Sequence, residues 1–137
     1  MTPKRDFVQD IAEKCRPVLE QLARTKRLRG KKLKHPGFVT YGERARIVGP
    51  QVGLPNLDPH ETRLRNALGR LSEETYDERG VLISVLVVNA DTMLPGRGFF
   101  WLARVHLGAY PVDASDDEVF IQETKRVYEH YRKHPSG

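Results

Sequence analysis

The segment VLISVLVVN, residues 81–89, most constrains the fold because only Ser84 and Asn89 in it are polar. A run of this kind has to be buried, and its β-branched residues favour a strand that is covered on both faces. Most of the rest of the chain carries its apolar residues at helical spacing. We therefore expect a mostly α member of the α/β class, with one buried strand among helices.

The N-terminal segment is expected to form an amphipathic helix over residues 5–24. Its apolar side chains recur on one helical face, and Pro17 inside the pattern is expected to kink or split the helix. Cys15 lies on the apolar face, so we expect a buried thiol. As the only cysteine it cannot form an internal disulfide, and a reducing cytoplasm is the simplest location.

A second helix is expected to begin at the stretch TYGE. Thr40 can cap the helix, and Glu43 stands three residues later, which is the spacing of a capping box. The helix is predicted from Tyr41 to about Val48, with Gly49-Pro50 as its end.

A third helix is predicted from a second capping box, formed by Asp58 and Glu61, to about Asp77. Gly69 lies within it. Because glycine lowers helix propensity, we expect Gly69 to allow a close contact with a neighbouring element. The inward-facing residues are predicted to be Leu64, Ala67, Leu68, Leu71 and Thr75.

After the apolar run, residues 90–98 are rich in turn-forming residues, and FFWLARVHL is predicted to be a short helix. Ser115 opens a terminal helix that runs to about Lys133. Its inward-facing residues are predicted to be Val119, Phe120, Thr124, Val127 and Tyr131.

Two short helices followed by a strand and a turn are the order of a winged helix-turn-helix, whose second helix enters the major groove of DNA. We therefore expect a winged-helix-like core over residues 37–107 within a single domain, residues 1–137. The N-terminal helix (1–24), a basic loop (25–36) and the C-terminal helix (115–134) are added to this core.

The excess of positive charge, +5 overall, lies in the N-terminal third. The stretch TKRLRGKKLKH, residues 25–35, contains many basic residues and no acid. Such a run attracts phosphate and releases counterions from nucleic acid. The alternative is a solvated loop that aids solubility. The basic residues are Lys26, Arg27, Arg29, Lys31, Lys32 and Lys34.

The ordered set VTYGERARIVG, NALG, VLVVN and PGRGF resembles the C-terminal DNA-binding domain of the alkylguanine-DNA alkyltransferases and alkyltransferase-like proteins. The resemblance covers residues 37–100. It implies that Tyr41 supports rotation of a target nucleotide out of the duplex. The family arginine that fills the gap in the duplex matches Asn66, with Arg65 beside it and Arg63 nearby.

The chain departs from this family at the position of the nucleophile. Where the family has Pro-Cys-His-Arg, this sequence has Ile83, Ser84, Val85 and Leu86. A serine hydroxyl without an adjacent base is too weak a nucleophile for alkyl transfer. The resemblance therefore implies the fold and DNA contact, and argues against the reaction.

Other candidate chemistry is less favoured. His130 and His134 stand at a metal-binding spacing, but no third ligand is evident. Asp77, Glu78 and Asp91 flank the apolar run as in a metal-dependent nuclease. The stretch FFWL is expected to pack in the core rather than to stack on bases.

Arg97 lies in PGRG, which is interpreted either as the tip of a wing that reaches a phosphate or as a simple turn. No apolar run reaches the roughly 18 residues that a membrane span needs. Acids inside the N-terminal pattern argue against a secretory signal.

Taken together, the sequence predicts a non-enzymatic protein that binds duplex DNA, with RNA as a further possible partner and without a cofactor or metal. It would act as a regulator, a sensor of a modified base or lesion, or a phage- or defence-associated factor. The alternatives are a small metal-dependent nuclease or toxin-like domain and a protein-binding adaptor that associates through its terminal helices. The predicted contact residues are the six basic residues of 25–35 together with Tyr41, Arg63, Arg65, Asn66 and Arg97.

Overall fold

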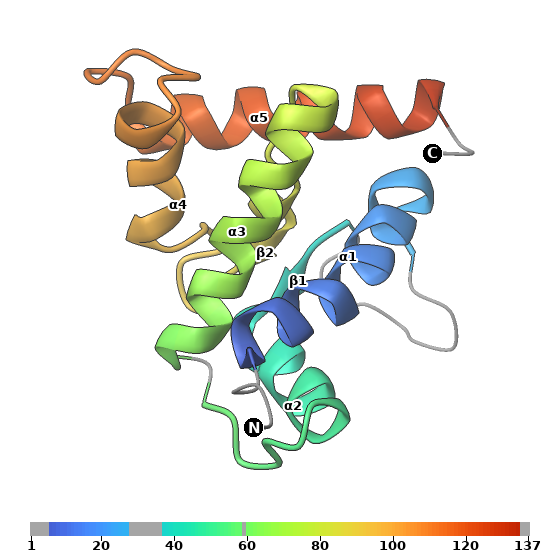
Figure 1. Cartoon of the computed structure of the whole chain (residues 1–137). Helices are drawn as coiled ribbons and strands as arrows, with labels where there is room; N and C mark the ends of the chain where they lie inside the picture. Colours follow the sequence, from blue (N-terminus) through green and yellow to red (C-terminus); the bar gives the residue numbers. More distant parts are fainter. Residues whose placement is uncertain (1–5, 28–36, 59, 135–137) are drawn as a thin grey trace.

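The computed structural model describes residues 6–27, 37–58 and 60–134 of the chain. It is mostly helical with a small two-stranded sheet (Figure 1). In chain order the elements are α1 (Phe7–Thr25), β1 (Val39–Thr40), α2 (Tyr41–Gln51), α3 (Thr62–Arg79), the 3-10 helix η1 (Ile83–Leu86), β2 (Val87–Val88), α4 (Arg97–Trp101), the π-helix η2 (Leu102–His106) and α5 (Asp116–Lys133).

The apolar run forms the centre of the fold, and every residue from Val81 to Val88 is buried. Its predicted conformation is only partly right. Residues 87 and 88 pair with β1 as parallel strands, whereas residues 83–86 form the 3-10 helix η1. Tertiary hydrogen bonds explain the turn: α3 and α5 supply side chains that bind the backbone N–H groups of Leu82, Ile83 and Ser84.

Helices α1, α3 and α5 pack around this centre, and α5 crosses one end of α3 (Figure 1). Helix α1 is continuous through Pro17, so the predicted split does not occur. The ring is exposed, and the helix loses only the hydrogen bond that the missing N–H would donate. Cys15 is fully buried, as predicted.

Helix α2 begins as predicted, because the Thr40 hydroxyl accepts a hydrogen bond from the Glu43 N–H at 3.1 Å. The predicted end is wrong, since α2 continues through Gly49 and Pro50 to Gln51. Gly49 is required here because an added Cβ would collide with the Leu54 carbonyl. The Leu54 N–H donates to the Gly49 carbonyl at 2.7 Å, which closes the last turn.

Helix α3 begins at Thr62, so the predicted second capping box is wrong. The Asp58 carboxylate accepts from the His60 N–H at 2.7 Å in a local turn, and Glu61 caps α3 without a side-chain hydrogen bond. The close contact expected at Gly69 is also absent, since no atom lies within 4 Å of an added Cβ. All five residues predicted to face inward are buried.

The predicted short helix is present as α4 and η2, and the terminal helix α5 is capped by Ser115, whose hydroxyl accepts from the Glu118 N–H. Val119, Val127 and Tyr131 are fully buried, while Phe120 and Thr124 are half-buried. Among the helices of the described residues, none is long and apolar enough to cross a membrane.

Candidate nucleic-acid interface

Tyr41 connects α2 to the turn that precedes α4. Its side chain is only 6% exposed, and its hydroxyl accepts a hydrogen bond from the Gly96 N–H at 2.9 Å. An added Cβ on Gly96 would collide with the guanidinium of Arg65 and stand 3.4 Å from the Tyr41 hydroxyl. Gly96 therefore lets α2, α3 and this turn meet. Tyr41 supports this meeting point and lies mostly in the core.

Arg65 lies over the Tyr41 ring, with its guanidinium carbon 4.2 Å from the ring centroid. Its Nη2 donates to the Asn89 Oδ1 at 3.4 Å and lies 3.4 Å from the His60 Nδ1. Among the described residues, no carboxylate forms an ion pair with Arg65. The guanidinium is thus held in place by the Tyr41 ring, the Asn89 amide and His60, and its charge remains available to an anion.

The two neighbouring arginines of α3 differ from Arg65 because each is ion-paired. Arg63 donates to Glu61 at 2.6 Å and lies over the Phe7 ring. Arg70 donates to Asp6 at 3.1 Å and to Gln9 at 3.1 Å. Arg65 and Arg63 therefore differ in whether their charge is already paired, a difference that the sequence pattern does not indicate.

A groove of about 700 Å³, which we call the Tyr41 groove, opens at the start of α2. Asn89 closes one wall, because its side-chain amide donates to the Leu94 carbonyl at 3.2 Å while its oxygen accepts from Arg65. Arg97 is exposed at the start of α4, but Pro95 and Gly96 are buried, so PGRG is not an exposed loop tip. The lining residues are Thr40, Tyr41, Gly42, His60, Asn89, Ala90, Asp91, Thr92 and Arg97.

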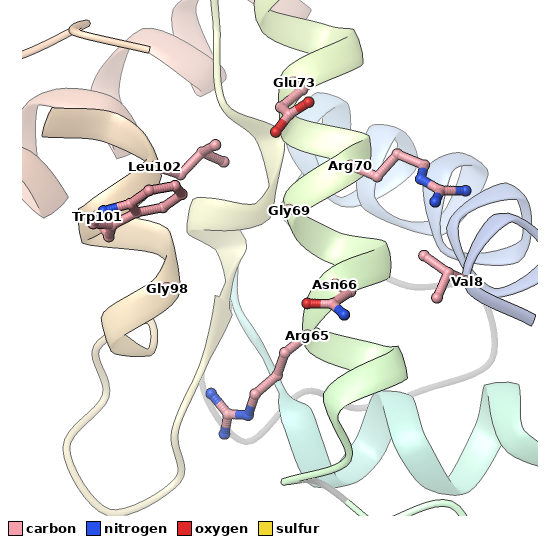
Figure 2. A pocket seen from close by; sticks show the side chains of 9 residues that line it. All are labelled: Val8, Arg65, Asn66, Gly69, Arg70, Glu73, Gly98, Trp101 and Leu102. Atoms are coloured by element: carbon pink, nitrogen blue, oxygen red, sulfur yellow. The ribbon is translucent and has the colours of Figure 1, made fainter. Parts of the chain in front are cut away.

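A second groove of about 420 Å³, the Gly69 groove, crosses α3 on the other side of Arg65 (Figure 2). Figure 2 shows Trp101 of α4 and Leu102 of η2 on one side of α3, and Arg70 and Val8 on the other. Asn66 is exposed in this groove. The lining residues are Val8, Arg65, Asn66, Gly69, Arg70, Glu73, Gly98, Trp101 and Leu102.

The basic residues near position 26 do not join this site. Lys26 and Arg27 follow the C-terminal end of α1, and the Lys26 ammonium lies 4.9 Å from the Tyr128 ring centroid. The opposite end of α1 carries Phe7, which contacts Arg63, and 19 helical residues span about 28 Å. Arg29, Lys31, Lys32 and Lys34 lie outside the described residues.

Neither Ser84 nor Cys15 is placed as a nucleophile. Ser84 is 5% exposed, and its hydroxyl shares a hydrogen bond of 2.6 Å with the Ser72 hydroxyl. Val85, its neighbour, is buried and carries no base. Burial raises the pKa of the Cys15 thiol to about 11, which keeps it protonated at neutral pH.

The carboxylates of the nuclease alternative do not come together. Asp91 lines the Tyr41 groove, whereas Asp77 and Glu78 stand at the other end of α3, about 18 Å along the helix from Arg65. Glu78 is bound by Arg16. Across residues 6–27, 37–58 and 60–134, no three His, Cys, Asp or Glu side chains are grouped as metal ligands.

Asn89, His60 and Gly96 belong to the site but were not singled out in the sequence. Asn89 is the polar residue that ends the apolar run, and this position is the sequence signal from which it could have been identified. The contacts of Arg65 with Asn89 and of Tyr41 with Gly96 join residues far apart in the chain. Compared with known protein families, curated proteins and solved structures, the chain has no significant match.

Proposed function

We propose that this chain is a non-enzymatic protein that binds duplex DNA through the N-terminal half of α3. The observation that carries the proposal is Arg65, a cation fixed beside two grooves without a carboxylate partner among the described residues. A guanidinium that is not paired with a carboxylate can bind a phosphate oxygen through charge-assisted hydrogen bonds.

In this proposal α2 and α3 act as the helix pair of a winged-helix-like core, and α3 is the helix that meets the DNA. Asn66, exposed one residue after Arg65, presents an amide that can pair with a base edge. Arg97 supplies a further cation from the start of α4, in the place of a wing. The connection between α2 and α3, residues 52–61, is longer than the turn of about three or four residues in a simple helix-turn-helix.

The basic run contributes long-range attraction in this proposal, and the site on α3 contributes orientation. The resemblance to the alkyltransferase family supports a role as a sensor of a modified base, and regulation is the other role open to such a protein. The positions of Ser84 and Cys15 argue against alkyl transfer, because both are buried and the Ser84 hydroxyl is hydrogen-bonded to Ser72.

The test is a titration of a labelled duplex of about 20 base pairs with the protein at several salt concentrations. Binding is measured as the change in fluorescence anisotropy of the label. We expect saturable binding whose logarithmic affinity falls linearly with the logarithm of salt concentration. A second duplex with one alkylated guanine shows whether a lesion is preferred, and mass spectrometry of that mixture should show no adduct. The absence of any duplex binding at low salt would refute the proposal.

A protein-binding adaptor is the second candidate, favoured by Ile121, which is 62% exposed on the terminal helix α5. An apolar residue at this exposure suits a contact with a second copy of the chain. Light scattering over a range of protein concentrations decides this. A dimer that becomes monomeric with Ile121→Lys would support the adaptor, and a wild-type monomer would exclude self-association through α5.

A further inference from the structure

Gly69 has no structural explanation in the fold. It stands in the middle of α3, where glycine destabilises a helix relative to alanine. An added Cβ would meet no atom within 4 Å, and the same is true of Gly98 in α4. Both glycines line the Gly69 groove, so their missing side chains keep it open.

Trp101 forms the rim of this groove and is 54% exposed, which contradicts the expectation that FFWL packs entirely in the core. Phe99 and Phe100 fill the core instead. One face of the indole stacks on His106, with centroids 5.3 Å apart and planes inclined by 20°. The His106 Nε2 lies 3.3 Å from a carboxylate oxygen of Glu73 on α3. The indole is thus positioned from behind by the facing helix.

We propose that the Gly69 groove binds an unpaired nucleobase, stacked on the free face of Trp101. The two glycines leave open space in the groove, and its volume of about 420 Å³ lies within the range of small-ligand sites. The Asn66 amide offers a donor and an acceptor to the base edge. Arg65, at the end of the groove, is placed to hold the adjoining phosphate.

The ligand is inferred from the side chains that line the Gly69 groove. The resemblance to the alkyltransferase family would instead place a rotated nucleotide beside Tyr41, in the Tyr41 groove. Aromatic stacking accepts any base, so the site selects for an unpaired base and not for a sequence. This inference rests on the proposed function because it takes a nucleic acid as the partner. A free nucleotide and a single strand share the same base, and the experiment separates these two sources.

Trp101 is the only tryptophan of the chain, so intrinsic tryptophan fluorescence reports on this groove alone. The wild-type protein is titrated with a ten-nucleotide thymidine strand, a fully paired duplex of the same length and thymidine monophosphate. We expect the strand to quench the fluorescence with saturation. The duplex should bind by anisotropy with little quenching, and the mononucleotide should quench only at concentrations at least about 100-fold higher because it lacks neighbouring phosphates.

Variants separate stacking from general attraction. Trp101→Ala should lower the affinity for the labelled strand about tenfold or more while duplex affinity changes less than about twofold. Gly69→Ala should weaken the quenching of Trp101 by the strand, because its methyl group enters the groove. Val105→Ala is the matched control, since Val105 is 58% exposed one turn further on and does not line the groove.

The outcomes also separate this inference from the proposed function. Duplex binding without quenching by the strand, or an unchanged strand affinity in Trp101→Ala, overturns the inference and leaves the proposed function standing. Loss of both duplex and strand binding in the wild-type protein overturns both. Circular dichroism of each variant checks that the fold is retained.

Discussion

The two halves of α3 carry polar side chains for different purposes. In the C-terminal half, Ser72 and Thr75 are fully buried, and their hydroxyls bind the backbone of residues 81–84. In the N-terminal half, Asn66 is exposed, Arg65 has no carboxylate partner among the described residues, and Gly69 faces open space. One helix therefore has a structural half and a half in which Arg65 and Asn66 remain available to a ligand.

This difference shows how to separate structure from function on one element. Buried polar groups that are fully hydrogen-bonded specify a fold, and they need no further explanation. Local features that lower stability without a packing gain, such as Gly69, are candidates for function. The comparison predicts that substitutions in the two halves affect different properties, stability in one and binding in the other.

The largest effect is expected for Thr75→Val. Valine keeps the shape of threonine but removes the acceptor of the Ile83 N–H and the donor to the Val81 carbonyl, and both groups are buried. The expected loss is about 2–4 kcal/mol in the free energy of unfolding, measured in urea. DNA binding by the folded fraction should not change. A loss under about 0.5 kcal/mol would show that the hydroxyl contacts do not stabilise η1.

A large effect on binding alone is expected when Lys31, Lys32 and Lys34 are replaced by Gln. The affinity for every duplex should fall by a similar factor, and the salt slope should decrease by about 2 to 3. Anisotropy titrations at several salt concentrations measure both quantities. If affinity and slope stay the same, the basic run serves solubility.

A smaller effect, on the pH dependence of stability, is expected for Glu123→Gln. Glu123 is fully buried and accepts from the Leu82 N–H and the Tyr110 hydroxyl, and burial raises the pKa of its carboxyl above 4.5. The folded state therefore binds this proton more tightly than the unfolded state does. The resulting stability is present below pH 4.5 and is lost as the pH rises through the folded pKa.

Glutamine keeps an acceptor for the Leu82 N–H and cannot titrate. The stability of the Glu123→Gln variant should therefore not fall with rising pH on account of this residue. Thermal melts of both proteins from pH 4.5 to 8 should show the wild-type protein losing stability relative to the variant. If the wild-type protein instead became more stable relative to the variant as the pH rises, the pKa of Glu123 would not be raised in the folded state.

The smallest effect is expected for Gly69→Ala, which should raise the free energy of unfolding by about 0.5–1 kcal/mol. The new methyl group meets no atom within 4 Å, so helix propensity is the main term. Urea unfolding measures the change. A destabilised variant would mean that Gly69 is needed for packing.

Local signals in the sequence were enough to predict part of the fold. The caps at Thr40 and Ser115 involve residues three apart, and the buried face of α3 follows from helical spacing. The 3-10 helix η1 was not predicted, because side chains of α3 and α5 decide its conformation through long-range hydrogen bonds.

The candidate site was predicted less well than the fold. The sequence placed Arg63, Arg65 and Asn66 together, but only tertiary contacts pair Arg63 with Glu61 and set Arg65 over Tyr41. Similarly, the pattern of FFWL does not reveal which ring is exposed, and the packing of α4 against α3 leaves Trp101 at the surface.

The central claim is that the N-terminal half of α3 binds DNA through Arg65, and the matched pair Arg65→Gln and Arg63→Gln tests it most directly. Both variants remove one positive charge, two residues apart on the same helix, and thermal melts establish that both are folded. We predict that Arg65→Gln weakens duplex binding about tenfold or more and lowers the salt slope by about 1. Because Arg63 is already ion-paired with Glu61, Arg63→Gln should change the affinity less than about threefold. Equal losses for the two variants, or none for Arg65→Gln, would contradict the account.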